Sequence, residues 1–168
     1  MSSVIGMKEI HWAYYRKDQY SFLGIDNPTD GNINQGRIME MPDWGDRFPA
    51  FEWCVNLGKG WYLPSYQEMM TIKSHVLLLQ TILPYSLKQY FMTSTEKELK
   101  GKSGYSVYVV NPLLAADSIT NGKIFGTAII AVTTFDSTRP SPAPVRKKYN
   151  VGDYYNDGKK EGIVFEVT

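Results

Sequence analysis

Residues 48 to 70, with the sequence FPAFEWCVNLGKGWYLPSYQEMM, constrain the fold more than any other part of this chain. An apolar stretch leads into a glycine turn, a Trp-x-Leu-Pro corner and a Ser-x-x-Glu pattern made by Ser65 and Glu68. This pattern is a capping box, in which each side chain accepts a hydrogen bond from the backbone N–H of the other residue. Apolar residues then recur at intervals of three and four up to Leu83. The block therefore predicts one helix that ends near Leu57 and a second that runs from Ser65 to about Leu83.

The first of these helices has a candidate cap in Asp43 or Asp46, and Pro49 falls in its first turn, where a missing N–H costs nothing. Its apolar residues lie on one helical stripe, formed by Ala50, Trp53, Cys54 and Leu57. Gly58 follows the stripe and supplies the left-handed residue that ends a helix. The pattern predicts that Cys54, the only cysteine of the chain, is buried in the core.

This position argues against nucleophilic and metal chemistry at the cysteine. A thiol in an apolar core is ordinarily unreactive. The two histidines, His11 and His75, are far apart in sequence and have no metal-binding spacing. A single cysteine also excludes an internal disulfide. We therefore expect no enzyme activity and no transition-metal site.

The segments outside this block have mostly β character. A strand is expected around Lys8–Tyr15, and five more are expected after the helices, at 90–95, 105–110, 123–135, 150–155 and 162–167. The stretch AIIAV at 128–132 is apolar on both alternating faces, which is typical of a central strand. Asn156-Asp157-Gly158 predicts the tight turn of a terminal hairpin. The expected fold class is α+β, with two helices packed on one side of a twisted antiparallel sheet that has long loops.

A long loop is expected from Asp18 to Pro42, because Gly, Asn, Asp and Pro recur every few residues there. Within it, Asp30, Asn32 and Asn34 stand at alternate positions, as in the opening of a calcium-binding loop. The glycine comes one place late, and a methionine stands where the bidentate acid of such a loop is needed. No cofactor is expected, calcium is the weaker alternative, and otherwise these side chains cap their own turns.

Charge and hydropathy exclude two classes of partner. Eighteen basic and seventeen acidic residues give a net charge of +1, so no global field attracts nucleic acid. No apolar run approaches the eighteen or more residues needed to cross a membrane, and VLLL at 76–79 lies inside an amphipathic pattern. The chain is rich in aromatic residues, with twelve tyrosines and four tryptophans. Such rings are typical of surfaces that recognise sugars or proteins.

The central block resembles the Lcl domain family of bacteria, whose members have a C-type-lectin-like fold. The resemblance rests on AFEWC followed by GWYLPSYQEM, on YFMTSTE at 90–96 and on Val145-Arg146, and it spans about residues 40–146. Family versions from Bacteroides-type bacteria carry a segment like YNVGDYYNDGKKEGIVFEV ahead of this block, whereas here that segment comes last, at 149–167. The resemblance implies a single C-type-lectin-like domain in which the order of the terminal segment is permuted.

In a lectin-like fold the first and last strands lie side by side, so the terminal hairpin is expected beside the N-terminal strand. By the same analogy, loops around 94–104, 111–122 and 136–144 form a ligand-binding end. The ligand-binding residues expected there are Glu96, Asn111, Asp117 and Arg139. The chain lacks the Glu-Pro-Asn and Trp-Asn-Asp motifs of calcium-dependent lectins, so the fold alone implies no sugar site.

These observations lead to three functional hypotheses for a single domain over residues 1–168. The first is a non-catalytic adhesion or ligand-binding module of a bacterial surface or secreted protein, which binds a carbohydrate or protein through its loops and acts outside the cell. The second is an assembly module in which the hairpin 149–168 is exchanged between copies, giving a homodimer or tandem array. The third, and least favoured, is an enzyme with an unrecognised site.

Overall fold

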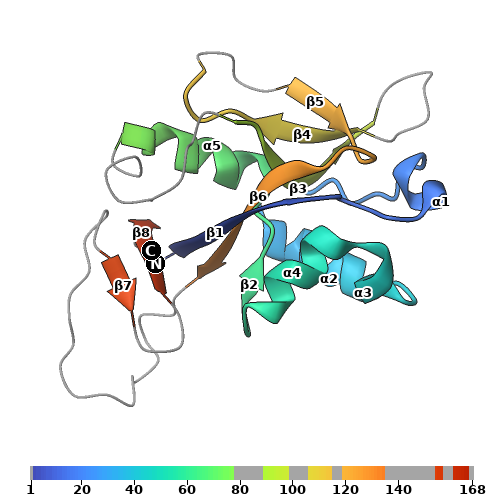
Figure 1. Ribbon diagram of the computed structural model, residues 1–168, viewed down its shortest axis with the longest axis horizontal. Helices are drawn as coiled ribbons and strands as arrows, with labels where there is room; N and C mark the ends of the chain where they lie inside the picture. The colour runs from blue at the N-terminus through green and yellow to red at the C-terminus, as the bar shows by residue number, and fades with distance from the viewer. Residues whose placement is uncertain are drawn as a thin grey trace.

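The computed structural model shows one curled sheet with helices on both of its faces (Figure 1). The residues that it describes are 2–77, 89–98, 106–114, 119–134, 154–156 and 161–166. The helices in these ranges are α1 (Arg16–Gln19), α2 (Gly31–Met39), α3 (Trp44–Arg47), α4 (Pro49–Asn56) and α5 (Tyr66–Ser74). The strands are β1 (Ser2–Ile10), β2 (Trp61–Tyr62), β3 (Phe91–Lys97), β4 (Ser106–Val110), β5 (Ile119–Gly122), β6 (Thr127–Thr134), β7 (Tyr154–Asn156) and β8 (Glu161–Glu166).

The sheet has the strand order β5-β4-β3-β6-β1-β8-β7, and β2 pairs with β6 outside this path. The pairs are antiparallel except for β3 and β6, which run parallel where Phe91 lies opposite Ala128. The α+β class is therefore confirmed, but the sheet is mixed and the prediction of a purely antiparallel sheet is wrong. Strand β6 is central, as its apolar sequence predicts, and residues 127–133 are all buried.

Strand β6 divides the apolar core into two clusters, because its side chains alternate between the two faces of the sheet. Ile129 belongs to one cluster and Ile130 to the other. Helix α4 contributes Phe51 and Cys54 to the first cluster, whereas α5 contributes Ile72 to the second. The prediction that both helices share one side of the sheet is therefore wrong, and Figure 1 shows α4 and α5 on opposite sides of β6.

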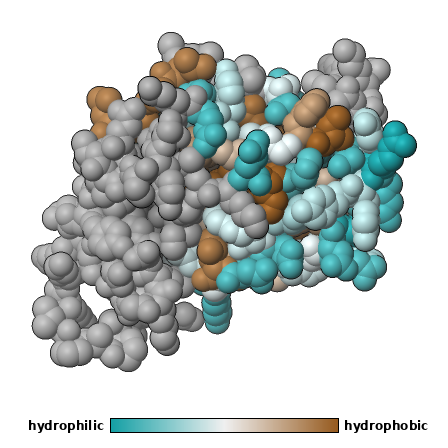
Figure 2. All heavy atoms as spheres, in the orientation of Figure 1, coloured by the Kyte–Doolittle hydropathy of each residue, from teal (hydrophilic) through white to brown (hydrophobic). Residues whose placement is uncertain are grey.

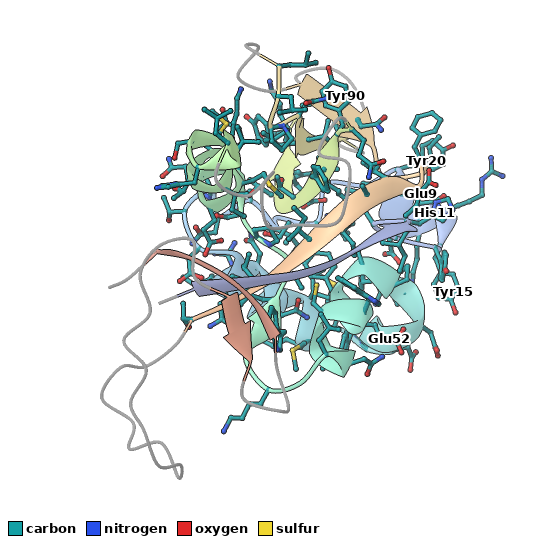
Figure 3. All side chains as sticks on the ribbon, turned by 60° about the vertical axis from the view of Figure 1, so that its left-hand side comes forward. Glu9, His11, Tyr15, Tyr20, Glu52 and Tyr90 are labelled. Carbon is teal, nitrogen blue, oxygen red and sulfur yellow. The ribbon has the colours of Figure 1, made fainter. Side chains whose placement is uncertain are left out.

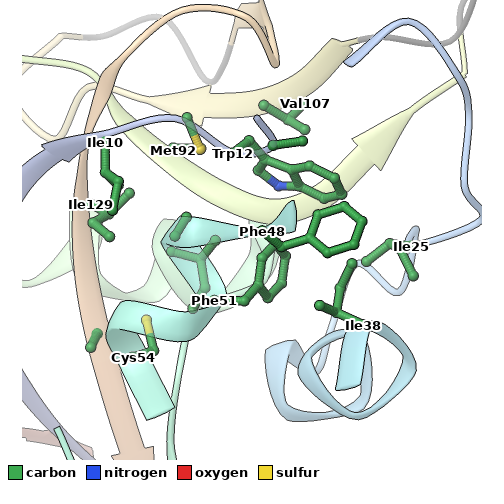
Figure 4. Packing of buried hydrophobic residues seen from close by; sticks show 14 of the residues in the cluster. Ile10, Trp12, Ile25, Ile38, Phe48, Phe51, Cys54, Met92, Val107 and Ile129 are labelled. Atoms are coloured by element: carbon green, nitrogen blue, oxygen red, sulfur yellow. The ribbon is translucent and has the colours of Figure 1, made fainter. Parts of the chain in front are cut away.

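The larger cluster is built around three aromatic rings (Figure 4). Trp12 lies edge-on to Phe48 and Phe51, with ring centroids 5.7 and 5.1 Å apart. All three side chains are fully buried. Burial of a phenylalanine contributes roughly 1.5–3 kcal/mol, and an edge-to-face pair adds about 0.5–1.5 kcal/mol. The block that contains Phe48 and Phe51 is therefore the scaffold on which the first face is packed.

The local predictions for this block are confirmed. Ser65 Oγ accepts a hydrogen bond from the Glu68 N–H at 3.4 Å, and Glu68 Oε2 accepts one from the Ser65 N–H at 2.8 Å, so the capping box is formed. The two residues of β2 form the expected short extended piece. Gly58 has a φ of 131°, a backbone conformation that favours glycine, just after the end of α4.

The predicted end of the first strand is wrong. The first strand ends at Ile10 and does not extend to Tyr15, because Trp12 turns into the core. Helix α5 ends at Ser74, residues 76 and 77 are helical again after His75, and the rest of the predicted helix, from residue 78 to Leu83, lies outside the described residues. Strand β5 was not expected at all.

The predicted loop from Asp18 to Pro42 contains helix α2. Its sequence, GNINQGRIM, includes two glycines, which lower helix propensity and conceal the helix. Neither Asp43 nor Asp46 caps α4, because its N-cap position is taken by Phe48 without a side-chain hydrogen bond. The Phe48 ring is instead buried in the core, and Pro49 occupies the first turn of the helix as predicted.

The terminal strands β7 and β8 form an antiparallel hairpin, and β8 pairs with β1 through Ser2, Ser3 and Val4. This confirms the prediction that the terminal hairpin lies beside the N-terminal strand. Of the predicted turn, Asp157 and Gly158 lie outside the described residues. None of the helices in the described ranges has the length and apolar character needed to cross a membrane.

Candidate functional site

Of the four residues predicted to bind ligand, the structure describes Glu96 and Asn111, and these two lie apart. Glu96 lies in β3 and its side chain is fully buried. Asn111 follows β4 and is also buried, and its amide oxygen accepts a backbone hydrogen bond. Glu96 pairs with Val107 near the start of β4, so it lies about 13 Å along the strand from Asn111. The prediction of a shared loop end is wrong for these two, and Asp117 and Arg139 lie outside the described residues.

The residues proposed for calcium lie at the start of α2. Asp30 is the N-cap, and its Oδ1 accepts hydrogen bonds from two backbone N–H groups at 2.8 and 3.2 Å. Asn34 is buried and donates to Ser94 Oγ at 2.9 Å, whereas Asn32 is exposed. Asp30 is engaged in capping the helix, Asn34 lies in the interior and Asn32 is exposed to solvent, so the three side chains do not converge as they would in a calcium loop. Among the described residues, no group of three or more His, Cys, Asp and Glu side chains is placed to hold a metal ion.

The main polar feature of the interior is an ion pair between Lys123 and Glu96. Neither side chain has any exposed surface. Lys123 Nζ donates to Glu96 Oε1, and it also donates to the backbone oxygens of Asp18 and Ser21 at 3.1 and 2.6 Å. The Trp12 ring lies 4.6 Å from Nζ. The turn between β5 and β6, which carries Lys123, is thus attached to the segment around α1.

Glu96, which belongs to β3, binds the backbone of the segment that follows α1. Its Oε2 accepts the N–H groups of Leu23 and Ile25 at 2.9 and 2.8 Å. Burial raises the pKa of Glu96 and lowers the pKa of Lys123, because removal from water penalises the charged form of each. The mutual attraction and the hydrogen bonds oppose both shifts. The pair therefore connects three segments that are distant in sequence: residues 18–25, strand β3 and the β5–β6 turn. We call this ion pair and its hydrogen bonds the clamp.

A second ion pair attaches α1 to α3. Arg47 Nη2 donates to Asp18 Oδ1 at 2.7 Å, and Arg47 Nε donates to Oδ2 at 3.0 Å, which makes the pair bidentate. The hydrogen bond to Asp18 is the main reason that the pKa of Arg47 is raised. The backbone N–H of Tyr14 donates to the Arg47 oxygen at 2.9 Å. The chain around α1 is therefore bonded both to Arg47 of α3 and to Lys123 of the β5–β6 turn.

The segments held in this way expose five aromatic side chains, which we call the aromatic end. They are Tyr14 (53% exposed), Tyr15 (48%), Tyr20 (42%), Phe22 (37%) and Phe125 (54%). Phe125 comes from the β5–β6 turn. His11 links that turn to the segment just before α1, because its Nδ1 is hydrogen-bonded to the Ile124 oxygen at 3.0 Å and its ring centroid lies 5.7 Å from that of Tyr14. Figure 3 shows Tyr15, Tyr20 and His11 at the end of the molecule where α1 lies.

Hydrophobic and hydrophilic surfaces lie directly side by side near the aromatic end, as Figure 2 shows. A separate open hollow of about 450 Å³ lies over α3 and α4, and it is lined by Asp43, Trp44, Gly45, Asp46, Glu52, Val55 and Asn56. None of the five exposed rings lines this hollow. The aromatic end is therefore separate from the hollow over α3 and α4.

Cys54 is a packing residue, as predicted. Its side chain is fully buried, and burial raises the pKa of the thiol. A thiol in this state is mostly protonated at neutral pH and is a poor nucleophile. The described residues near Cys54 therefore supply no basis for covalent catalysis.

Sequence reasoning missed both the aromatic end and the clamp beneath it. The stretch YYRKDQYSF at 14–22 interleaves rings and charges, which is a readable signal, but it was divided between a predicted strand and a predicted loop. The burial of Lys123 could not be predicted from the sequence, because a lysine next to a turn is ordinarily solvated. The clamp joins residues 27 to 105 positions apart in the chain, which a local pattern does not reveal.

Known proteins give no further guide to this site. Comparisons of the chain with family profiles, with curated proteins and with solved structures find no match. The geometry of the described residues is therefore the basis for a functional proposal.

Proposed function

We propose that this protein is a non-catalytic recognition module of a bacterial surface or secreted protein, and that it binds a protein ligand through the aromatic end. The observation that carries the proposal is the group of five exposed rings on segments held by one buried ion pair, Lys123–Glu96, and one partly buried ion pair, Arg47–Asp18. Sizeable exposed apolar patches on soluble proteins commonly mark interaction sites. The resemblance to the Lcl domain, and the C-type-lectin-like fold that it implies, support a location at the cell surface.

The composition and rigidity of the aromatic end favour a protein ligand over a carbohydrate. Tyrosine, phenylalanine and arginine are enriched at protein interfaces. Tyrosine also offers a large contact area and loses little conformational entropy on binding. The clamp formed by Lys123 and Glu96 holds the backbone in place before binding, which reduces the entropic cost further. Phe22 and Phe125 have no polar group with which to bond sugar hydroxyls.

The test compares the wild-type chain with a ring variant, Tyr15→Ala/Phe22→Ala/Phe125→Ala. Both are screened against a phage-displayed random peptide library and a glycan array, with and without calcium. We expect the wild type to select peptides that the ring variant does not bind. Leu114→Ala is the matched control, because Leu114 is 45% exposed but lies at the other end of the β4–β5 hairpin from Phe125.

Circular dichroism and thermal unfolding establish that each variant is folded. Glycan binding that the ring variant loses would replace the protein ligand by a carbohydrate at the same surface. Binding that the ring variant retains, or no ligand from either screen, would overturn the proposal.

A second function, assembly through an exchanged hairpin, is favoured by one observation. Among the described strands, the β7–β8 hairpin joins the sheet through β1 alone. Such a hairpin can be donated to another copy without breaking the remaining strand pairs. Size-exclusion chromatography with light scattering tests this function. A monomer at every concentration argues against assembly, whereas a dimer that disappears when residues 149–168 are deleted supports it.

A further inference from the structure

The exposed charge of the aromatic end is mainly positive. Arg16 and Lys17 are exposed on α1, and within the described part of the chain neither forms an ion pair. Asp18, the carboxylate of the same helix, is buried against Arg47. The helix thus hides its negative charge and presents two positive charges to solvent next to Tyr15 and Tyr20.

The neighbouring charged groups do not cancel this pair of cations. Lys123 and Glu96 neutralise each other in the interior. His11 is engaged with the backbone of the β5–β6 turn. Glu9 is an exposed carboxylate that lies against Gly126 of that turn, and Figure 3 shows it at the same end of the molecule as His11 and Tyr20. Within the described part of the chain, the exposed charges of α1 itself are therefore both positive, and Glu9 is the exposed carboxylate that contacts the turn carrying Phe125.

We propose that the aromatic end binds an acidic segment of a partner protein. Aspartate or glutamate side chains of the partner contact Arg16 and Lys17, while neighbouring apolar side chains lie on Tyr20 and Phe22. This inference rests on the proposed function and names the class of partner. Arg16 is positioned for the role, because its Cζ lies 6.0 Å from the centroid of the Tyr20 ring. A guanidinium held over a ring presents a planar set of donors that matches a carboxylate.

The charges and the rings contribute to different stages of binding. Complementary charge at the edge of an interface mainly speeds association and selects the partner. Burial of aromatic side chains mainly slows dissociation, because these rings are the usual sites of large binding energy. Charge reversal at α1 and removal of the rings are therefore expected to change different rate constants.

The experiment uses the peptides that the whole chain selects from the random library. We expect these peptides to be enriched in aspartate and glutamate next to aromatic or aliphatic residues. An Arg16→Glu/Lys17→Glu variant is expected to bind them about tenfold more weakly at low salt, mainly through slower association. The difference shrinks at high salt because the charges are exposed and screened. Lys59→Glu, which reverses an exposed charge in the turn before β2, is expected to bind like the wild type.

Two results would overturn this inference and leave the proposed function intact: peptides that bind the aromatic end without an acidic bias, or unchanged binding by the charge-reversal variant. Peptides that bind the ring variant as well as the wild type would overturn both. If the charge-reversal variant does not fold, Arg16→Gln/Lys17→Gln is measured instead, and it must show a weaker salt dependence than the wild type.

Discussion

Lys123 and Glu96 carry charges where solvent does not reach them. Removal of each ion from water costs several kcal/mol, and mutual attraction offsets that cost only when the remaining hydrogen bonds are also formed. They are formed here, because Nζ has three acceptors and the carboxylate has backbone donors on both oxygens. Such a pair adds little net stability while intact, but loss of one partner leaves a buried charge without compensation.

Glu96→Gln and Lys123→Met are each expected to lower the free energy of unfolding by about 3–5 kcal/mol. The double variant is expected to cost clearly less than the sum, because neither charge is then left alone in the interior. Urea denaturation of the four proteins measures these differences.

The exposed pair of Arg37 and Asp26 supplies the control for that comparison. Its side chains are 47% and 54% exposed, so Arg37→Gln is expected to change stability by less than about 1 kcal/mol. Additive costs for Glu96→Gln and Lys123→Met would show that the two buried charges are not coupled, which contradicts the clamp.

At the scale of elements, helices α2 and α5 meet at their N-termini around one carboxylate. Glu68 Oε2 accepts the N–H groups of Ser65 and Gly31 at 2.8 and 2.9 Å, and its Oε1 accepts the Tyr62 hydroxyl at 2.8 Å. A negative charge at a helix N-terminus is stabilised by unpaired N–H groups and by the helix dipole. Glu68 acts in this way on two helices at once.

Ser65→Ala is expected to destabilise the protein by about 1 kcal/mol, which is typical for the loss of an N-cap. Glu68→Ala is expected to cost roughly twice as much, because three donors lose their acceptor. Gln67→Ala, at an exposed position between them, is the control and is expected to change stability by less than about 0.5 kcal/mol. Thermal unfolding ranks the three variants, and equal costs for Ser65→Ala and Glu68→Ala would show that Glu68 serves α5 alone.

Helix α2 offers a matched pair of glycines. A Cβ on Gly31 would lie 2.3 Å from the Leu63 oxygen and 2.8 Å from the Ser65 nitrogen, both of which are backbone atoms. Gly31→Ala is therefore expected to force α2 away from the corner before α5 and to destabilise by about 2 kcal/mol or more. A Cβ on Gly36 meets nothing within 4 Å, so Gly36→Ala is expected to stabilise the helix by about 0.5–1 kcal/mol. Chemical denaturation compares them, and equal effects would contradict this packing.

The features that could be predicted from sequence are those that depend on nearby residues. The capping box joins Ser65 to Glu68, and residues 128–132 of β6 are all apolar, so both features could be predicted. The same uniform apolarity left the two faces of β6 indistinguishable, which is why α4 and α5 were assigned to one side. Glu96 was expected in a ligand loop by analogy with the lectin-like fold, and its burial depends on Lys123, which lies 27 positions later in the chain.

At the scale of the whole molecule, the terminal hairpin extends the sheet beyond β1. Deletion of residues 149–168 leaves β1 with β6 as its remaining neighbour and exposes the backbone groups that β8 pairs. We expect this deletion to lower the melting temperature by several degrees, since about 1 kcal/mol corresponds to roughly 2–4 °C for a domain of this size. Thermal unfolding and light scattering measure the loss of stability and any new association. An unchanged melting temperature would refute a structural role for the hairpin.

Strand β6 has a consequence for the order in which the chain folds. It pairs with β1, β2 and β3, and both apolar clusters include its side chains, yet it follows all the described helices in sequence. During synthesis β1 leaves the ribosome long before β6 exists, so the rings of Trp12, Phe48 and Phe51 have no sheet to cover. Contacts between segments so distant in sequence form slowly, and the exposed intermediates of such folding are prone to aggregate. The three rings therefore remain uncovered during synthesis until β6, which ends at Thr134, is available to pair.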